Sequence, residues 1–166
     1  MCGAGRRRRL CLDADHGPAK AWRVTAALVV ALSVIAFAAA FHLHWAFGGR
    51  FGFSVSLPQE PDGRPVLAHL LPLWRPAAFG VALCLVALSA LALARAGVVG
   101  LPLDPELVRW ALAGVGAAFT LRALAPNRYV GFFKRLRSTR WARYDTRLYS
   151  PLFLLLGLAL LRLAAG

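Results

Sequence analysis

Charged residues are scarce in this chain of 166 residues: they make up 16% of it, whereas hydrophobic residues make up 59%. A soluble globule of this size needs more polar surface than these residues supply. The composition therefore argues against an ordinary soluble domain and predicts that many apolar side chains face lipid.

Motifs that carry catalytic or ligand chemistry are also missing. The three cysteines, Cys2, Cys11 and Cys84, do not have the spacing of a metal knuckle or a disulfide framework. The sequence contains no nucleophile motif, no glycine-rich phosphate loop and no paired carboxylates. These gaps favour a protein that is not an enzyme and holds no cofactor.

The histidines are too dispersed to predict a metal site. His42 and His44 are two positions apart, so on a helix they would point about 200° away from each other. Helical residues that share a metal are three or four positions apart. We interpret His44, which stands beside Trp45, as a polar residue at the membrane interface.

The net charge of +13 raises the question of a nucleic-acid partner. No motif for groove or strand recognition is present, and the basic residues flank apolar runs. This placement is typical of contacts with anionic lipid headgroups. We therefore expect membrane lipids as partners and no nucleic acid; a protein partner or a homo-oligomer is left open.

Four apolar segments predict an all-α integral membrane bundle of four transmembrane helices. They lie at about residues 24–47, 75–95, 105–125 and 150–165. The first contains a charge-free run of 26 residues, more than the roughly 20 that cross hydrocarbon, which favours an uncleaved anchor over a signal peptide. Ser150 and Pro151 are predicted to cap and open the last helix. Residues 1–21 are predicted to form a disordered basic tail, and residues 22–165 the transmembrane domain.

The segment 127–147 concentrates basic and aromatic residues between the last two spans. On a helical wheel its aromatic side chains fall on one face, which predicts an interfacial amphipathic basic helix. The candidate contacts to lipid headgroups are Lys134, Arg135, Arg137 and Arg140. A simpler interpretation, a positively charged connector that only sets topology, is left open.

The distribution of basic residues leaves the membrane orientation undecided. With a cytoplasmic N-terminus, nine basic residues lie inside and eleven outside. If the tail is discounted, the counts favour a cytoplasmic location for the segment 122–147 by eleven to five.

Arg122 is predicted to lie near the end of the third span, where its charge needs a partner or access to the interface. Asp145 is the only acidic residue after Glu106, so we expect it to pair with Arg122 or a neighbouring arginine. The alternative is that Asp145 only caps the turn into the last span. Together with His44 and Trp45, these two residues form a candidate polar cluster.

Several sequence motifs, in this order, resemble the domain-of-unknown-function family 3995, which comprises small bacterial multi-pass membrane proteins. The resemblance extends from Val24 to about Ala164 and rests on segments 44–52, 121–123, 129–135 and 144–152. It implies four membrane helices and no assigned activity.

This chain departs from the family pattern at two places. At residues 125–127 the family tends to have a small residue, an acid and an aromatic, and at Phe153 a cysteine is common. With no acid at Pro126, Asp145 is the remaining candidate for a charge pair.

Two functions follow from these expectations. The first is a non-catalytic multi-pass protein of the cell (plasma) membrane whose basic aromatic loop contacts anionic lipid or a protein partner. The alternative is a small membrane-embedded carrier or enzyme for an anionic or lipid-like ligand. The alternative requires His44, Trp45, Arg122 and Asp145 to line one cavity.

Overall fold

The computed structural model describes the backbone of residues 4–166 and the side chains of residues 22–166. Its elements are α1 (Ala4–Ala46), the 3₁₀ helices η1 (Phe53–Val55) and η2 (Ala68–Leu73), α2 (Trp74–Arg95), α3 (Pro105–Leu124), α4 (Arg140–Tyr144), the π-helical turn η3 (Asp145–Tyr149) and α5 (Ser150–Ala165). No strand occurs within residues 4–166.

Four helical stretches are long and apolar enough to cross a membrane. They are Trp22–Ala46, Ala68–Arg95, Pro105–Leu124 and Arg140–Ala165. Large apolar side chains such as Leu83, Val86 and Leu158 are more than half exposed, as expected for side chains that face lipid. The predicted all-α membrane bundle of four spans is confirmed.

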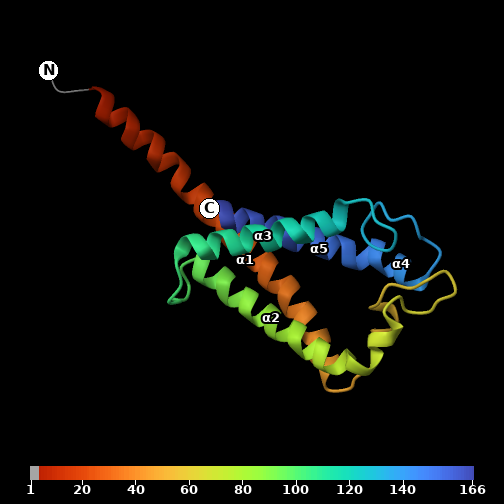
Figure 1. Ribbon diagram of the computed structural model, residues 1–166. Coiled ribbons are helices and arrows are strands. Elements are labelled where there is room, and N and C mark those ends of the chain that lie inside the picture. The colour runs from red at the N-terminus through yellow and green to blue at the C-terminus, as the bar shows by residue number, and fades with distance from the viewer. Residues whose placement is uncertain (1–3) are drawn as a thin grey trace.

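The helices form two antiparallel pairs. The most extensive packing is between α3 and α5 and between α1 and α2, and α1 also contacts α5. Figure 1 shows that the two pairs diverge toward the end of the bundle where α1 and α3 finish. The residues buried where the pairs meet include Ile35, Leu112 and Leu160.

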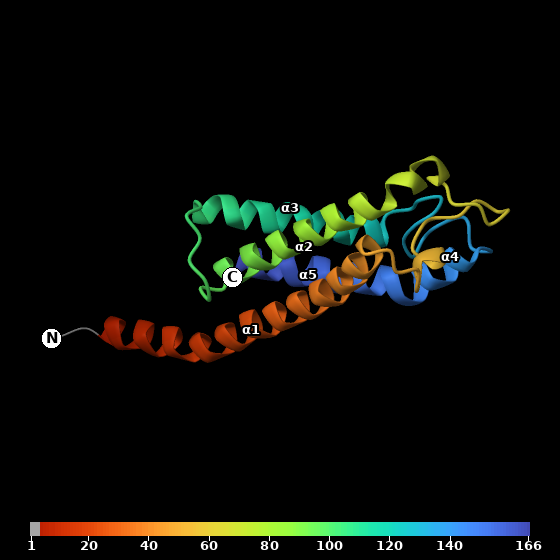
Figure 2. The ribbon, with the colours of Figure 1, turned by 90° about the horizontal axis from the view of Figure 1, so that it is seen from below.

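Both long connections lie at the same end of the bundle, as Figure 2 shows. We call this the loop end; it comprises residues 47–73 and 125–139. The short connection 96–104 and the C-terminus lie at the opposite end.

Small residues bring α3 and α5 close together. A Cβ atom added to Gly157 would lie 2.8 Å from the carbonyl oxygen of Gly116, and one added to Gly116 would lie 2.9 Å from that of Gly157. Glycine at both positions therefore permits close backbone contact, as is common between membrane helices.

The last span begins earlier than predicted. Thr139, not Ser150, is the N-cap, and its Oγ1 accepts a hydrogen bond from the N–H of Ala142 at 3.1 Å. The helix passes through Pro151 because η3 precedes it: the N–H of Ser150 donates to the carbonyl of Asp145 in the wider π-helical pattern. Such local adjustments are how membrane helices accommodate proline.

Two other expectations differ from the structure. Residues 4–21 continue α1 instead of forming a disordered tail, since arginine, alanine and leucine all favour helix; residues 1–3 lie outside the described part. Residues 126–139 contain no helix, so the amphipathic helix predicted within 127–147 is not confirmed. Gly131 has φ of +87°, and the N–H of Phe132 donates to the carbonyl of Ala123 at 2.8 Å. The chain therefore turns back onto the end of α3.

Candidate functional site

Asp145 is the centre of a buried polar cluster at the loop end. Its side chain is 0% exposed. Oδ1 accepts a hydrogen bond from Arg122 Nη2 at 2.8 Å, and Oδ2 accepts from Lys134 Nζ at 2.9 Å. Oδ2 also accepts from the Gly131 N–H at 2.9 Å and from Ser150 Oγ at 3.1 Å. The predicted ion pair between Arg122 and Asp145 is confirmed, and the Asp145 side chain does not cap the turn into the last span.

Lys134 is the second charge of the cluster. Its side chain is 1% exposed, and Nζ donates to Asp145, to the carbonyl of Gly131 at 2.9 Å and to Thr146 Oγ1 at 2.6 Å. These bonds use all three donors of the ammonium group. Lys134 is therefore a structural cation that fixes residues 131–134 to the last span, and it is not available to a lipid headgroup.

Arg122 is the third charge and is only partly satisfied. Its guanidinium carbon lies 4.0 Å from the centroid of the Phe153 ring, a cation–π contact. Nη2 bonds to Asp145, but Nη1 is buried with no hydrogen-bond partner in the described residues. A buried charged donor without a partner is costly, so Nη1 is a place where an added acceptor would be favourable.

Gly131 positions the loop on this cluster. A Cβ atom at this position would lie 2.8 Å from the carbonyl oxygen of Arg122, and the positive φ already favours glycine. The close approach places the Gly131 N–H on Asp145 and brings Lys134 inward. Gly131 thus allows the basic loop to contribute Lys134 to the buried network.

The cluster carries an excess of positive charge. Arg122 and Lys134 face the single carboxylate of Asp145, so two cations balance one anion. The other acids at the loop end are engaged elsewhere: Glu60 lies 3.7 Å from Arg128, and Asp62 lies 2.6 Å from Arg64. One positive charge near the bundle interior is therefore uncompensated by the described residues.

A cavity of about 360 Å³ adjoins the cluster, between the two diverging helix pairs. All four spans contribute to its wall, which is mostly aromatic and aliphatic, with Phe37, Phe41, Phe119 and Phe153 among its residues. Polar groups on the wall belong to His42, Ser56, Arg122 and Tyr149. This combination of an apolar wall with a few polar groups is typical of ligand pockets.

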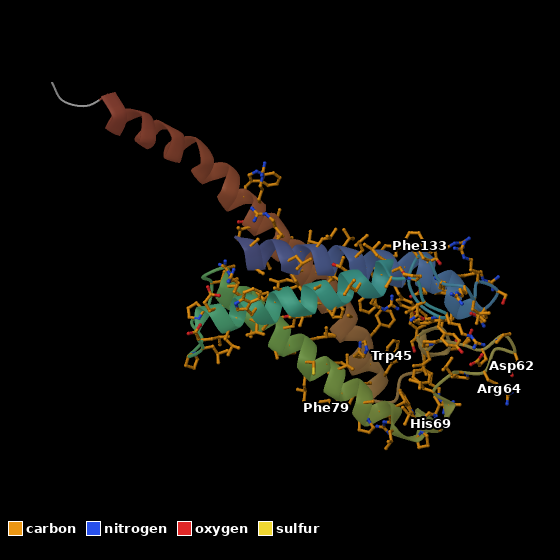
Figure 3. The ribbon with its side chains drawn as sticks, turned by 45° about the horizontal axis from the view of Figure 1, so that its top comes forward. Trp45, Asp62, Arg64, His69, Phe79 and Phe133 are labelled. Atoms are coloured by element: carbon orange, nitrogen blue, oxygen red, sulfur yellow. The ribbon has the colours of Figure 1, made fainter. Side chains whose placement is uncertain are left out.

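The predicted polar cluster is only partly brought together. Trp45 and Arg122 line the cavity, and Asp145 holds Arg122 from behind without lining it. Figure 3 shows Trp45 on α1 near its loop end. His44 is exposed and packs against Gly49, where an added Cβ would overlap the imidazole ring. The requirement that all four side chains line one cavity is therefore not met.

Sequence reasoning did not place His42 at the cavity or Lys134 in the buried cluster. His42 lines the cavity and lies three positions before Trp45, with their ring centroids 5.1 Å apart. The three-residue spacing on a helix was the available signal, since such residues share a face. For Lys134 the only signal was that Asp145 is the single acid among several nearby basic residues, so it could pair with more than one of them.

The remaining candidates for headgroup contacts, Arg135, Arg137 and Arg140, are all exposed. They lie in or next to residues 126–139, at the loop end. Phe133, in the same segment, is 60% exposed, and Figure 3 shows it on the outside of the bundle. The segment therefore presents arginines and an aromatic ring on its outer surface, as an irregular loop and not as a helix.

One chemistry that the residues of this site can support is recognition of an anion. No group of three or more histidine, cysteine or acidic side chains with metal-binding geometry occurs in the part of the chain that the structure describes. Asp145 is fully enclosed by donors, and Lys134 by acceptors. What is left to act is the free face of Arg122 at an apolar cavity, which can bind an anion.

Comparison with known proteins identifies a family for this sequence. The family model DUF3995, described as "Protein of unknown function (DUF3995)", matches residues 34–160. The match covers the second and third spans, most of the last span, the second half of the first span, and the residues of the buried cluster and the cavity. No curated protein and no solved structure matches the chain.

Proposed function

The chain belongs to the DUF3995 family of proteins of unknown function. From its own structure we propose that it is a non-catalytic, multi-pass protein of the plasma membrane. We propose that its loop end binds anionic lipid headgroups. The proposal concerns the surface formed by residues 126–147, which we call the basic cap. Its ligands are the phosphate groups of the leaflet that surrounds it.

One observation carries this proposal: the only acid in the basic cap is buried. Asp145 is 0% exposed and is bound to Lys134 and Arg122. The exposed charges of the cap are consequently all positive; they belong to Arg128, Arg135, Arg137, Arg140, Arg143 and Arg147. Of these, only Arg128 forms an ion pair among the described residues, at 3.7 Å from Glu60.

The location of these arginines supports a membrane ligand. The cap follows the end of α3 and includes the first two turns of the last span, and the boundary between hydrocarbon and headgroups is expected at the ends of spans. Exposed Phe133 and Tyr144 in the same segment suit the boundary between acyl chains and headgroups. Basic residues at a negatively charged membrane surface contribute about 1 kcal/mol each.

The test counts phospholipids bound to the purified protein in nonionic detergent by native mass spectrometry. The double variant Arg135→Gln/Arg140→Gln should weaken binding of phosphatidylglycerol by about thirtyfold, since two arginines contribute about 2 kcal/mol. Binding of phosphatidylcholine should not change.

A charge-matched control is Arg23→Gln/Arg64→Gln. It removes the same net charge from exposed positions outside the cap, and Arg64 is paired with Asp62. The control should leave phosphatidylglycerol binding close to that of the unmodified protein. If both double variants lose binding equally, the cap has no specific role and the proposal fails.

A further inference from the structure

We propose that the cavity between the helix pairs holds one acyl chain of an anionic lipid from the leaflet at the loop end, with its charged head against Arg122. This goes beyond the proposed function, which concerns only the outer surface of the cap. The site would be selective because it recognises both parts of the molecule.

The charge of the buried cluster indicates an anionic head. Arg122 and Lys134 share one carboxylate, which leaves one positive charge without a counter-ion. Lys134 has no free donor, whereas Arg122 has a buried Nη1 with no partner in the described residues and lines the cavity. A phosphate oxygen at the guanidinium would supply both the missing charge and an acceptor.

The depth of the cavity indicates a chain from one leaflet. Its wall on α1 extends from Trp45, at the loop end, to Val34. These residues are eleven positions apart, which is about 16 Å along a helix and roughly half of a 30 Å hydrocarbon core. Arg122 lies in the last turn of α3, two residues before the third span ends, so a head bound there would be close to the headgroups of that leaflet. The head and the chain thus lie as they do in the bilayer.

The cavity is accessible from the lipid side. Phe37 and Val81 line it and are still 43% and 41% exposed, so the wall on α1 and α2 is not closed off. A chain can therefore enter sideways between the diverging helix pairs without crossing a polar barrier. The volume of about 360 Å³ lies at the small end of the roughly 300–1,000 Å³ common for ligand pockets, which fits one chain better than two.

The π-helical turn supports a binding role for this wall. Tyr149 ends the turn and lines the cavity together with Leu148. Single π-helical turns inside α-helices occur frequently at functional sites. Here the turn also places Asp145 behind Arg122, so one local feature shapes both the wall and the charge cluster.

The experiment uses tryptophan quenching by lipids with brominated acyl chains. The protein carries Trp22→Phe and Trp110→Phe, because both rings are 64% exposed and would report lipid on the outer surface. The fluorescence of Trp45 and Trp141 then reports quencher at the cavity wall. Trp74 is kept in every variant, so it is a common background. The protein is reconstituted in phosphatidylcholine vesicles that contain a low fraction of brominated phosphatidylglycerol, brominated phosphatidylcholine or a brominated fatty acid.

We expect brominated phosphatidylglycerol to quench at a concentration about tenfold lower than brominated phosphatidylcholine. Both phosphates can accept a hydrogen bond from Arg122, but only phosphatidylglycerol brings a net negative charge, because the choline group of phosphatidylcholine cancels the charge of its phosphate. Ala38→Phe places a ring in the cavity and should remove this difference. Ala40→Phe, on the exposed side of the same helix, should preserve it. Arg122→Lys, which keeps a cation for Asp145, should reduce it.

Each opposite result overturns the proposal. Equal quenching by the two phospholipids excludes an anionic head, and equal behaviour of Ala38→Phe and Ala40→Phe excludes the cavity. Quenching by the fatty acid alone excludes a membrane phospholipid as the occupant. This test is independent of the test of the basic cap. Arg135→Gln/Arg140→Gln should leave the difference in quenching between Ala38→Phe and Ala40→Phe unchanged.

Discussion

Arg122 and Asp145 are 23 positions apart in the sequence and meet through a bond of 2.8 Å between Nη2 and Oδ1. Arg122 comes from the end of α3 and Asp145 from the π-helical turn before α5. The pair therefore joins the two helices that pack most extensively. Lys134 attaches the intervening loop to the same carboxylate at 2.9 Å. One acid consequently holds together the whole loop end of this helix pair.

Asp145→Asn should be among the most destabilising substitutions in the chain. It leaves Arg122 and Lys134 near each other without their counter-ion, and loss of one partner of a buried ion pair costs about 3–5 kcal/mol. Unfolding in detergent by increasing dodecyl sulfate, followed by circular dichroism, measures the loss. Asp62→Asn is the control, because exposed pairs contribute little. Equal stability of the two variants would contradict a structural role for Asp145.

A double-mutant cycle between Lys134 and Asp145 should show strong coupling. Lys134→Met alone leaves Arg122 paired with Asp145 in a neutral cluster, so its cost should be smaller than that of Asp145→Asn. In the Asp145→Asn background, Lys134→Met removes an uncompensated buried cation and should be nearly neutral or stabilising. We expect a coupling energy of about 1–3 kcal/mol from the same unfolding measurement. Additive effects would mean that the two charges do not interact.

Four spans could be predicted because charge-free runs are a property of composition. The predicted bounds of the first and third spans agree with the observed ones within two residues, whereas the second span begins seven residues earlier, at Ala68, because η2 directly precedes α2. The Arg122–Asp145 pair was also predictable, since the segment offered only one acid. In both cases a scarce residue type left few alternatives.

The rest depended on backbone geometry that composition does not reveal. The helical wheel that placed Lys134 opposite the aromatic face, as a contact to headgroups, assumed regular helix through Gly131. The positive φ of Gly131 instead turns the chain inward. The start of the last span was misplaced because Ser150 and Pro151 form a common N-terminal signal. Because the π-helical turn precedes Ser150, these two residues lie within a longer helix and not at its start. The cavity arises from the divergence of two helix pairs, and the sequence pattern alone does not predict the angle between them.

Glycine at the contact between α3 and α5 should tolerate no added methyl group. In Gly157→Ala the new Cβ would lie 2.8 Å from the backbone nitrogen of Thr120 and from the carbonyl oxygen of Gly116. We expect a loss of about 1–3 kcal/mol, as for other overpacked positions. Gly114→Ala is the matched control on α3, where a Cβ meets nothing within 4 Å. It should stabilise the helix by about 0.5–1 kcal/mol. The same sign for both variants in the unfolding assay would contradict this packing.

The hydrogen bond from Tyr129 to Glu60 should make the connection between the two long loops sensitive to alkaline pH. Tyr129 Oη donates to Glu60 Oε1 at 2.7 Å, and this bond raises the pKa of Tyr129 above its ordinary value near 10. Because the pKa is higher in the folded protein, the contribution to stability is complete below pH 10 and is lost as the pH rises through the folded pKa. The phenolate absorbance of Tyr129, obtained as the difference between the unmodified protein and Tyr129→Phe, should have its midpoint above pH 10. In Glu60→Gln the midpoint should fall toward pH 10, since the carboxylate that favours the neutral phenol is gone. A midpoint that does not respond to Glu60→Gln would show that this bond does not control Tyr129.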